Sequence, residues 1–268
     1  MHDPLPFRDR LRAAGLRFAA VAGAVAVWWA VARAQIWPPV FVPSPGSVWH
    51  QFLATSGLTG DGDGWAGYTL GEHLLASLRR MAIGCAYGVG GGIVLGLLIG
   101  LVPVLDTVLG PVVTFVRTLP PLAYLSLLVI WFGIDESPKV WLLLLAALPP
   151  VAVATADAVR AVPADYVYAA RSLGAGRAQI PWRIVLPAAA PEILTGIRVA
   201  VGVAYTTVVA AETVNGVPGI GGMIRDAQRY NQTDVVVLGI ILIGLSGLFF
   251  DALLRYAQRR LTPWRGRA

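Results

Sequence analysis

Six long apolar stretches constrain the fold of this chain more than any other feature of its sequence. They lie at about residues 16–37, 81–102, 110–133, 139–158, 190–211 and 233–254. A helix that crosses a lipid bilayer needs roughly 20 mostly apolar residues, and each stretch meets that length. The runs are continuous and lack the alternation of a membrane β-barrel. With a mean hydropathy of +0.67, the sequence predicts an all-α polytopic membrane protein with six transmembrane helices.

The positive residues are distributed unevenly between the two sides of such a protein. The formal net charge is +6, and every positive residue except Lys139 is arginine. A cytoplasmic N-terminus places most of these charges inside, as the positive-inside rule requires. We therefore expect both termini in the cytoplasm, and the distribution argues against a nucleic-acid partner. The inner set is Arg8, Arg10, Arg12, Arg17, Arg160, Arg171, Arg177, Arg183, Arg255, Arg259, Arg260, Arg265 and Arg267; the outer set is Arg33, Arg79, Arg80, Lys139, Arg225 and Arg229.

The inner segment 160–191 is too long for a tight helix connection and too rich in Ala and Leu to be merely solvated. Pro163 is suited to start a helix, and Asp165 places negative charge in its first turn. Gly174 then permits a sharp turn. The residues between them give a first short helix with a small, apolar face.

A second short helix is expected after that turn. Pro181 fits only near its first turn or at a bend, because an interior proline removes a hydrogen bond and clashes with the preceding turn. Pro187 together with Pro191 is expected to close this helix and lead into the fifth transmembrane helix. The two short helices should form a compact knob.

The stretch "YAARSLGAGRAQIPWRIVLP" resembles the EAA loop of binding-protein-dependent ABC importer permeases. That pattern is Glu-Ala-Ala, three residues, Gly, nine residues, Ile-x-Leu-Pro, and the spacing here agrees throughout. Tyr168 stands where the pattern has Glu, which leaves the ionic role of that Glu open. The resemblance implies a coupling helix that docks in a groove of a cytoplasmic ATPase. The matching or adjoining residues are Asp165, Ala169, Ala170, Arg171, Leu173, Gly174, Ile184, Leu186 and Pro187.

The resemblance extends over most of the chain. The stretches 117–139, 191–212 and 233–244 and the tail "QRRLTPWRG" are similar to permeases for taurine, aliphatic sulfonates, nitrate and bicarbonate, and the last two are most similar to taurine permeases. This implies a type I ABC importer permease fold. It also implies an ATP-driven, binding-protein-dependent importer of taurine or a related alkanesulfonate, with nitrate, bicarbonate or another small anion as the alternative cargo.

The family also implies a location in a bacterial inner membrane, and the apolar stretches together with the positive charges predict a division of the chain. We expect a cytoplasmic N-terminal segment at 1–15, a first transmembrane helix at 16–37 and a periplasmic connection at 38–80. A permease core with five transmembrane helices and the EAA loop at 160–191 would occupy 81–258. Residues 259–268 would form a cytoplasmic tail.

The chain lacks the residues needed to bind ATP itself. A P-loop requires Gly-Lys-Ser/Thr, and the only lysine, Lys139, lies in "ESPKVW". ATP and Mg are therefore expected on a partner ATPase, with no cofactor and no enzymatic activity in this chain. Six helices and a single EAA-like spacing indicate half a pathway, so we expect a homodimer with a two-fold axis along the membrane normal. The other expected partners are a cytoplasmic ABC ATPase dimer, a periplasmic or lipoprotein substrate-binding protein, and membrane lipid.

Arg117 lies several residues inside the third apolar stretch, where burying an unpaired charge costs at least ~2.5 kcal/mol. It has the right sign to meet an anionic sulfonate; the alternative is that it reaches the interface or pairs with Asp106. Pro120 and Pro121 are expected to break the helix and to expose backbone groups that line or gate a cavity. Tyr124 is assigned to the same candidate pathway.

Glu212 ends the fifth apolar stretch, after Thr206 and Thr207. These three residues are the remaining candidates for a pathway or gate. The carboxylate is expected either to meet the ammonium group of a zwitterion or to hold an outer gate closed through Arg225 or Arg229. The alternative is a helix cap or an interfacial charge.

Several other residues have structural interpretations. Asp251 and Arg255, four residues apart, are expected to pair. His73 has no second histidine or cysteine at ligand spacing, so no metal site is expected. The glycine-rich stretch 84–100 predicts close helix packing, and Cys85 within it is expected to be a packing residue.

Two other functional classes fit the sequence less well. An ion-gradient-driven secondary transporter usually has internal repeats, which are not detectable here. An intramembrane enzyme needs a nucleophile and base or metal ligands within the spans, and none is visible. The ABC importer permease is therefore the preferred interpretation.

Overall fold

The computed structural model describes residues 7–58 and 64–264, and every regular element in these ranges is a helix, which confirms the all-α prediction. Residues 1–6 and 265–268, which are the terminal portions of the two predicted cytoplasmic segments, lie outside the described residues. The long helices are α1 (Phe7–Arg33), α3 (Leu70–Leu101), α6 (Glu136–Arg160), α8 (Leu186–Asn215) and α10 (Thr233–Leu261). The shorter ones are α2 (Pro45–Ser56), α4 (Pro103–Thr118), η1 (Pro121–Tyr124), α5 (Leu125–Phe132), α7 (Ala164–Ser172), η2 (Pro181–Val185) and α9 (Ile220–Arg229).

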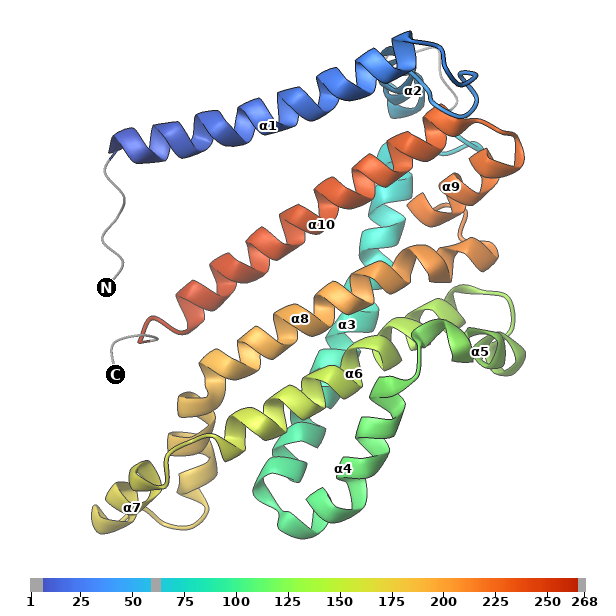
Figure 1. The fold of residues 1–268 in the computed structure, drawn as a ribbon. Coiled ribbons are helices and arrows are strands. Elements are labelled where there is room, and N and C mark those ends of the chain that lie inside the picture. The colour runs from blue at the N-terminus through green and yellow to red at the C-terminus, as the bar shows by residue number, and fades with distance from the viewer. Residues whose placement is uncertain (1–6, 59–63, 265–268) are drawn as a thin grey trace.

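Three of the long helices, α3, α6 and α8, make the core (Figure 1). The start of α1, the whole of α7 and the end of α10 lie at one end of the molecule, while α2, α5 and α9 lie at the other (Figure 1). The apolar part of α1, Gly15–Arg33, is not buried against the other described residues. The two ends of the molecule therefore carry different short helices, joined by α6 and α8.

Five of the described helices are long and apolar enough to cross a membrane, and a bent pair supplies a sixth candidate. The third apolar stretch, 110–133, is interrupted: α4 ends at Thr118, and the path from α4 to α5 bends by 94°. The break falls at Pro120 and Pro121, as the sequence predicted. Leu119 precedes a proline and is extended (φ −74°, ψ 131°), since a proline ring disfavours the helical conformation in the preceding residue.

Helices occupy much of the predicted connection over 38–80. Ser44 caps α2, and Pro45 follows at the first helical position. The helix α3 begins at Leu70 rather than near residue 81, because Thr69 and Glu72 form a complete capping box. Arg79 and Arg80, which we placed in this connection, lie within α3.

Glycines at every fourth position of α3 form its contact with α6, which confirms the predicted close packing. They are Gly84, Gly88, Gly92, Gly96 and Gly100, and a Cβ atom added to any of them would lie only 2.4–3.0 Å from an atom of α6. Lipid is as apolar as a leucine side chain, so helices in a bilayer associate through such close van der Waals packing. Cys85 is buried beside this contact and packs as expected.

The substitution Gly96→Ala should separate α3 from α6, because the new Cβ would lie 2.4 Å from the Ala152 carbonyl oxygen. We expect a loss of about 1–3 kcal/mol, the usual cost of overpacking, seen as a lower unfolding temperature in detergent. Gly90→Ala is the matched control, since nothing lies within 4 Å of its added Cβ. Equal unfolding temperatures for the two variants would contradict the packing argument.

Candidate functional site

The helix α7 and the turn after it form the first candidate site. Pro163 precedes α7, Asp165 lies in its first turn, and Gly174 follows with φ +86°, the left-handed conformation that favours glycine. The Ala175 N–H donates to the Ala170 carbonyl at 3.0 Å, which closes the helix end. The predicted short helix and its sharp turn at Gly174 are therefore present.

The second short helix differs from the prediction. Pro187 and Pro191 do not close it, because η2 continues directly into α8 and Pro191 lies inside that helix. The Leu186 N–H bonds to the Pro181 carbonyl, five residues back, in a π-helical turn. Such a wide turn accommodates an extra residue and a proline that cannot donate, so the chain runs on without a break.

This inner segment combines a packed base with an exposed apolar surface. Ala170 is buried, while Ile180 and Val185 pack in a cluster with residues of α6 and α8. Leu173 is 89% exposed, and Tyr166, Tyr168 and Trp182 are also exposed. Of the other predicted coupling residues, Ile184 and Leu186 are half-buried, and Asp165, Ala169, Arg171, Gly174 and Pro187 are exposed. An apolar surface of this kind on a rigid base is typical of a protein contact.

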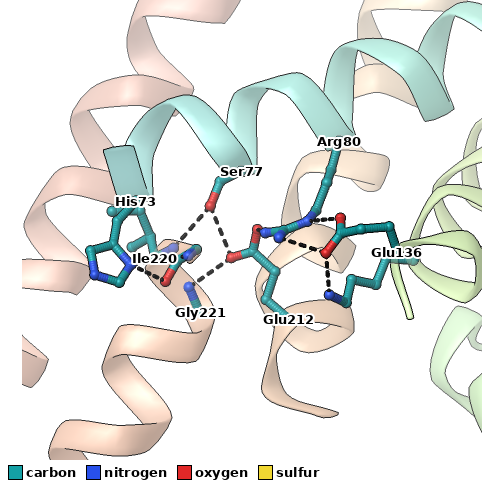
Figure 2. Close-up of polar contacts among 9 residues, drawn as sticks. His73, Ser77, Arg80, Glu136, Glu212, Ile220 and Gly221 are labelled. Carbon is teal, nitrogen blue, oxygen red and sulfur yellow. Dashed lines mark hydrogen bonds and ion pairs between the residues drawn. The ribbon is translucent and has the colours of Figure 1, made fainter. Parts of the chain in front are cut away.

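The second candidate site is a buried ion-pair cluster at the opposite end, where α3, α6, α8 and the start of α9 meet (Figure 2). Its centre is Glu212, which is only 1% exposed. Glu212 accepts hydrogen bonds from the Ser77 hydroxyl at 2.9 Å and from the Gly221 N–H at 2.8 Å. The Ser77 Oγ also accepts from the Ile220 N–H at 2.9 Å. The first turn of α9 is thus held by side chains of α3 and α8, and a carboxylate there is favoured by the helix dipole.

Four charged side chains balance one another in this cluster (Figure 2). Arg80 donates through Nη1 to Glu212 Oε1 at 2.7 Å and through Nε and Nη2 to the two carboxylate oxygens of Glu136 at 2.5 and 2.8 Å. Lys139 donates to Glu136 Oε1 at 2.7 Å. Arg80 and Lys139 are buried, while the Glu136 side chain is 54% exposed. The pairing is required because an unpaired charge in such surroundings is costly.

His73 completes the attachment of the segment before α9. Its Nδ1 accepts from the Gly219 N–H at 3.0 Å, so Nε2 carries the proton and donates to the Trp65 carbonyl at 3.0 Å. No group of metal-ligating side chains occurs among the described residues, and His73 is fully engaged by backbone. Its role in the structure is to position the loop that precedes α9.

The structure corrects two predictions about the pathway residues. The partner of Glu212 is Arg80 rather than Arg225 or Arg229, and Arg225 donates instead to the Val214 carbonyl. Arg117 does not pair with Asp106, which pairs with Arg160.

The remaining candidate pathway residues are exposed or half-buried near the bend or form only local hydrogen bonds within α8 in the single chain. Arg117 is exposed near the end of α4, followed by Pro120, Pro121 and Tyr124 at the bend. Thr206 and Thr207 both donate to the Val203 carbonyl. Within residues 7–58 and 64–264, no hydrogen bond or ion pair joins Arg117 to Glu212.

The C-terminal half of α10 holds a further ion pair that the sequence predicted. Arg255 pairs with Asp251 at 2.9 Å, which confirms the expectation from their spacing. Arg198 of α8 also donates to Asp251, at 2.5 Å, and this long-range contact was not predicted. The contact between Arg198 and Asp251 therefore joins α8 to α10.

Sequence reasoning missed the roles of Arg80, Glu136 and Lys139. One signal was present, because the only lysine of the chain lies three residues after a glutamate at the start of an apolar helix. The link to Arg80 spans 56 residues and depends on how α3 packs against α6. Nothing in the sequence encodes that contact directly.

Comparison with known proteins identifies the family. The family model described as "Binding-protein-dependent transport system inner membrane component" matches residues 92–263. The chain belongs to this family. It is thus a multi-pass membrane component of a transport system, and its helical fold is the one such permeases share.

Individual relatives extend the match over most of the chain. The taurine transport system permease protein TauC of Escherichia coli K12 is 43% identical over 240 residues, covering 90% of this chain and 86% of the relative. The putative aliphatic sulfonates transport permease protein SsuC of Bacillus subtilis is 38% identical, covering 72% and 70%. Among solved structures, a chain of the MetNI methionine ABC transporter in an inward-facing conformation has a TM-score of 0.57 at 19% identity, covering 72% of this chain and 94% of that chain. The last comparison shows the type I importer fold.

The substitution Arg80→Met should release the start of α9, because it leaves Glu212 buried without its cation. Breaking one partner of a buried pair costs about 3–5 kcal/mol. We expect the amides of α9 to exchange with deuterium at least about tenfold faster, measured on the intact protein in detergent.

Arg79→Met is the matched control for that experiment. It removes the same charge from the neighbouring residue, which is exposed and forms no ion pair with any other described residue. Unchanged protection of α9 in Arg80→Met, or equal loss in both variants, would contradict the role of the cluster.

Proposed function

We propose that this chain is the transmembrane permease subunit of an ATP-driven, binding-protein-dependent importer for taurine or a related alkanesulfonate. The observation that carries this proposal is the 43% identity to a taurine permease over 90% of the chain. The chain does no covalent chemistry. ATP and Mg are bound by a partner ATPase, and the permease supplies the path through the membrane.

The proposed assembly contains two copies of this chain, a cytoplasmic ABC ATPase dimer and a substrate-binding protein. The termini and α7 lie at the cytoplasmic side of a bacterial inner membrane. This orientation is supported by the arginines near that end, which include Arg160 before α7, Arg171 within it and Arg183 after it. The family description as an inner membrane component of a binding-protein-dependent system supports the same arrangement.

The inner segment is the proposed coupling element. The packed base around Ile180 and Val185 would transmit movement of the ATPase to α6 and α8, because both helices contribute to the same cluster. The exposed Leu173 and Tyr168 would enter the groove of the ATPase. With Tyr168 in place of the glutamate of the motif, we infer that this contact is apolar rather than ionic.

The proposed pathway passes the bend at Pro120 and Pro121 and the end of α8. Arg117, Tyr124, Thr206 and Thr207 would line it. Glu212, held by Arg80, would be part of an outer gate. The support for the gate is the buried ion-pair cluster, which fixes the α8–α9 connection to α3 and α6.

ATP hydrolysis in proteoliposomes tests the function. The complex of this chain with its ATPase should hydrolyse ATP faster when taurine-loaded binding protein is added than when empty binding protein is added. Stimulation by nitrate or bicarbonate but not by taurine would show that the cargo is a different anion, while the ATP-driven mechanism would stand. Taurine uptake without any ATPase would instead indicate a gradient-driven transporter and would refute the proposal.

The variant Leu173→Asp tests the coupling surface in the same assay. The side chain is exposed in the single chain, so the substitution should leave folding intact. Because a charge in an apolar contact is costly, we expect the stimulation to fall at least about tenfold. Leu173→Met preserves size and polarity and should keep the stimulation. Full stimulation of Leu173→Asp would exclude this surface from coupling.

A further inference from the structure

A cavity of about 360 Å³ opens beside the buried ion-pair cluster. Its polar wall consists of Arg79, Arg80 and Glu136, and its other walls are side chains of α3 and α6 and the loop residue Pro218. This volume lies near the lower end of the ~300–1,000 Å³ typical of small-molecule sites. The cavity is thus large enough for one small ligand.

The charges around this cavity leave one cation in excess. Arg80 and Lys139 are balanced by Glu136 and Glu212, so these four side chains sum to zero. Arg79, by contrast, is exposed and forms no ion pair within residues 7–58 and 64–264. The cavity therefore presents a net positive charge beside apolar walls, where charges are screened less than in water.

The two arginines differ in their freedom to bind a ligand. The guanidinium of Arg80 is fixed by three donated hydrogen bonds to carboxylates. The guanidinium of Arg79 keeps its donors available, and its planar fork matches the oxygens of an oxyanion. Pro218, which also lines the cavity, belongs to the loop that precedes α9, so a ligand held here would contact the segment attached to Glu212.

We propose that this cavity is a subsite for the sulfonate group of the cargo, with Arg79 as its recognition residue. The proposal rests on the proposed function for the nature of the cargo. An anion bound at Arg79 lies against both the ion-pair cluster and the α8–α9 connection, which is where a ligand would influence the outer gate. The phosphate of an anionic lipid headgroup offers the same oxyanion chemistry, and the experiment separates the two sources.

Equilibrium binding of radiolabelled taurine to the permease–ATPase complex tests the subsite without binding protein. The complex is placed in nanodiscs of phosphatidylcholine alone, and retention of added phosphatidylglycerol is measured in parallel. We expect Arg79→Gln to weaken taurine binding about tenfold, the usual effect of losing a hydrogen bond to a charged group. Arg33→Gln is the matched control, because Arg33 is an exposed arginine at the same end that stacks on Trp29 and does not line the cavity.

Each outcome has a distinct meaning. Loss of taurine binding in Arg79→Gln alone supports the sulfonate subsite. Loss of phosphatidylglycerol retention in Arg79→Gln, without any effect on taurine, assigns the cavity to lipid and overturns the sulfonate proposal. Equal behaviour of both variants and the native chain overturns the subsite altogether. The binding-protein-stimulated hydrolysis of the native complex is measured on the same preparation, so failure of the proposed function is seen separately.

Discussion

The close contact between α3 and α6 is the interaction on which the rest of this structure depends. In lipid, apolar side chains gain nothing by leaving their surroundings for one another, so helices are held by short distances and by polar contacts. The glycines of α3 permit those short distances over five successive turns. The same packing brings Arg80 of α3 beside Glu136 of α6, and from there the ion-pair cluster extends to α8 and α9.

The ion-pair cluster is a costly arrangement for a membrane protein, and its composition reflects that cost. Each buried charge has an opposite charge within hydrogen-bond distance, and the carboxylate of Glu212 also accepts two uncharged donors. Such a cluster favours one arrangement of four chain segments over near alternatives, because a small displacement leaves a charge unpaired.

The two candidate sites lie at opposite ends of the same pair of helices. The helix α6 runs from Glu136 at the ion-pair cluster to Arg160 near α7, and α8 runs from the π-helical turn at the inner segment to Glu212. Because α6 and α8 also pack on each other, a rigid movement at one end is carried to the other. This continuity is the physical basis on which the proposed ATPase contact at α7 would act on the proposed gate at Glu212.

The sequence by itself determined the class of the protein, the break at Pro120 and Pro121, and the turn at Gly174, because each depends on local chemistry: apolar length, a missing N–H, or a left-handed backbone. The capping-box pattern of Thr69 and Glu72 was also present in the sequence, and it would have predicted the start of α3 correctly. Only the tertiary structure decided that Glu212 pairs with Arg80, which lies 132 residues away. It also decided that α8 continues through Pro191 rather than ending there. Charge signs can be read along a chain, but the choice among several arginines depends on which helix faces pack together.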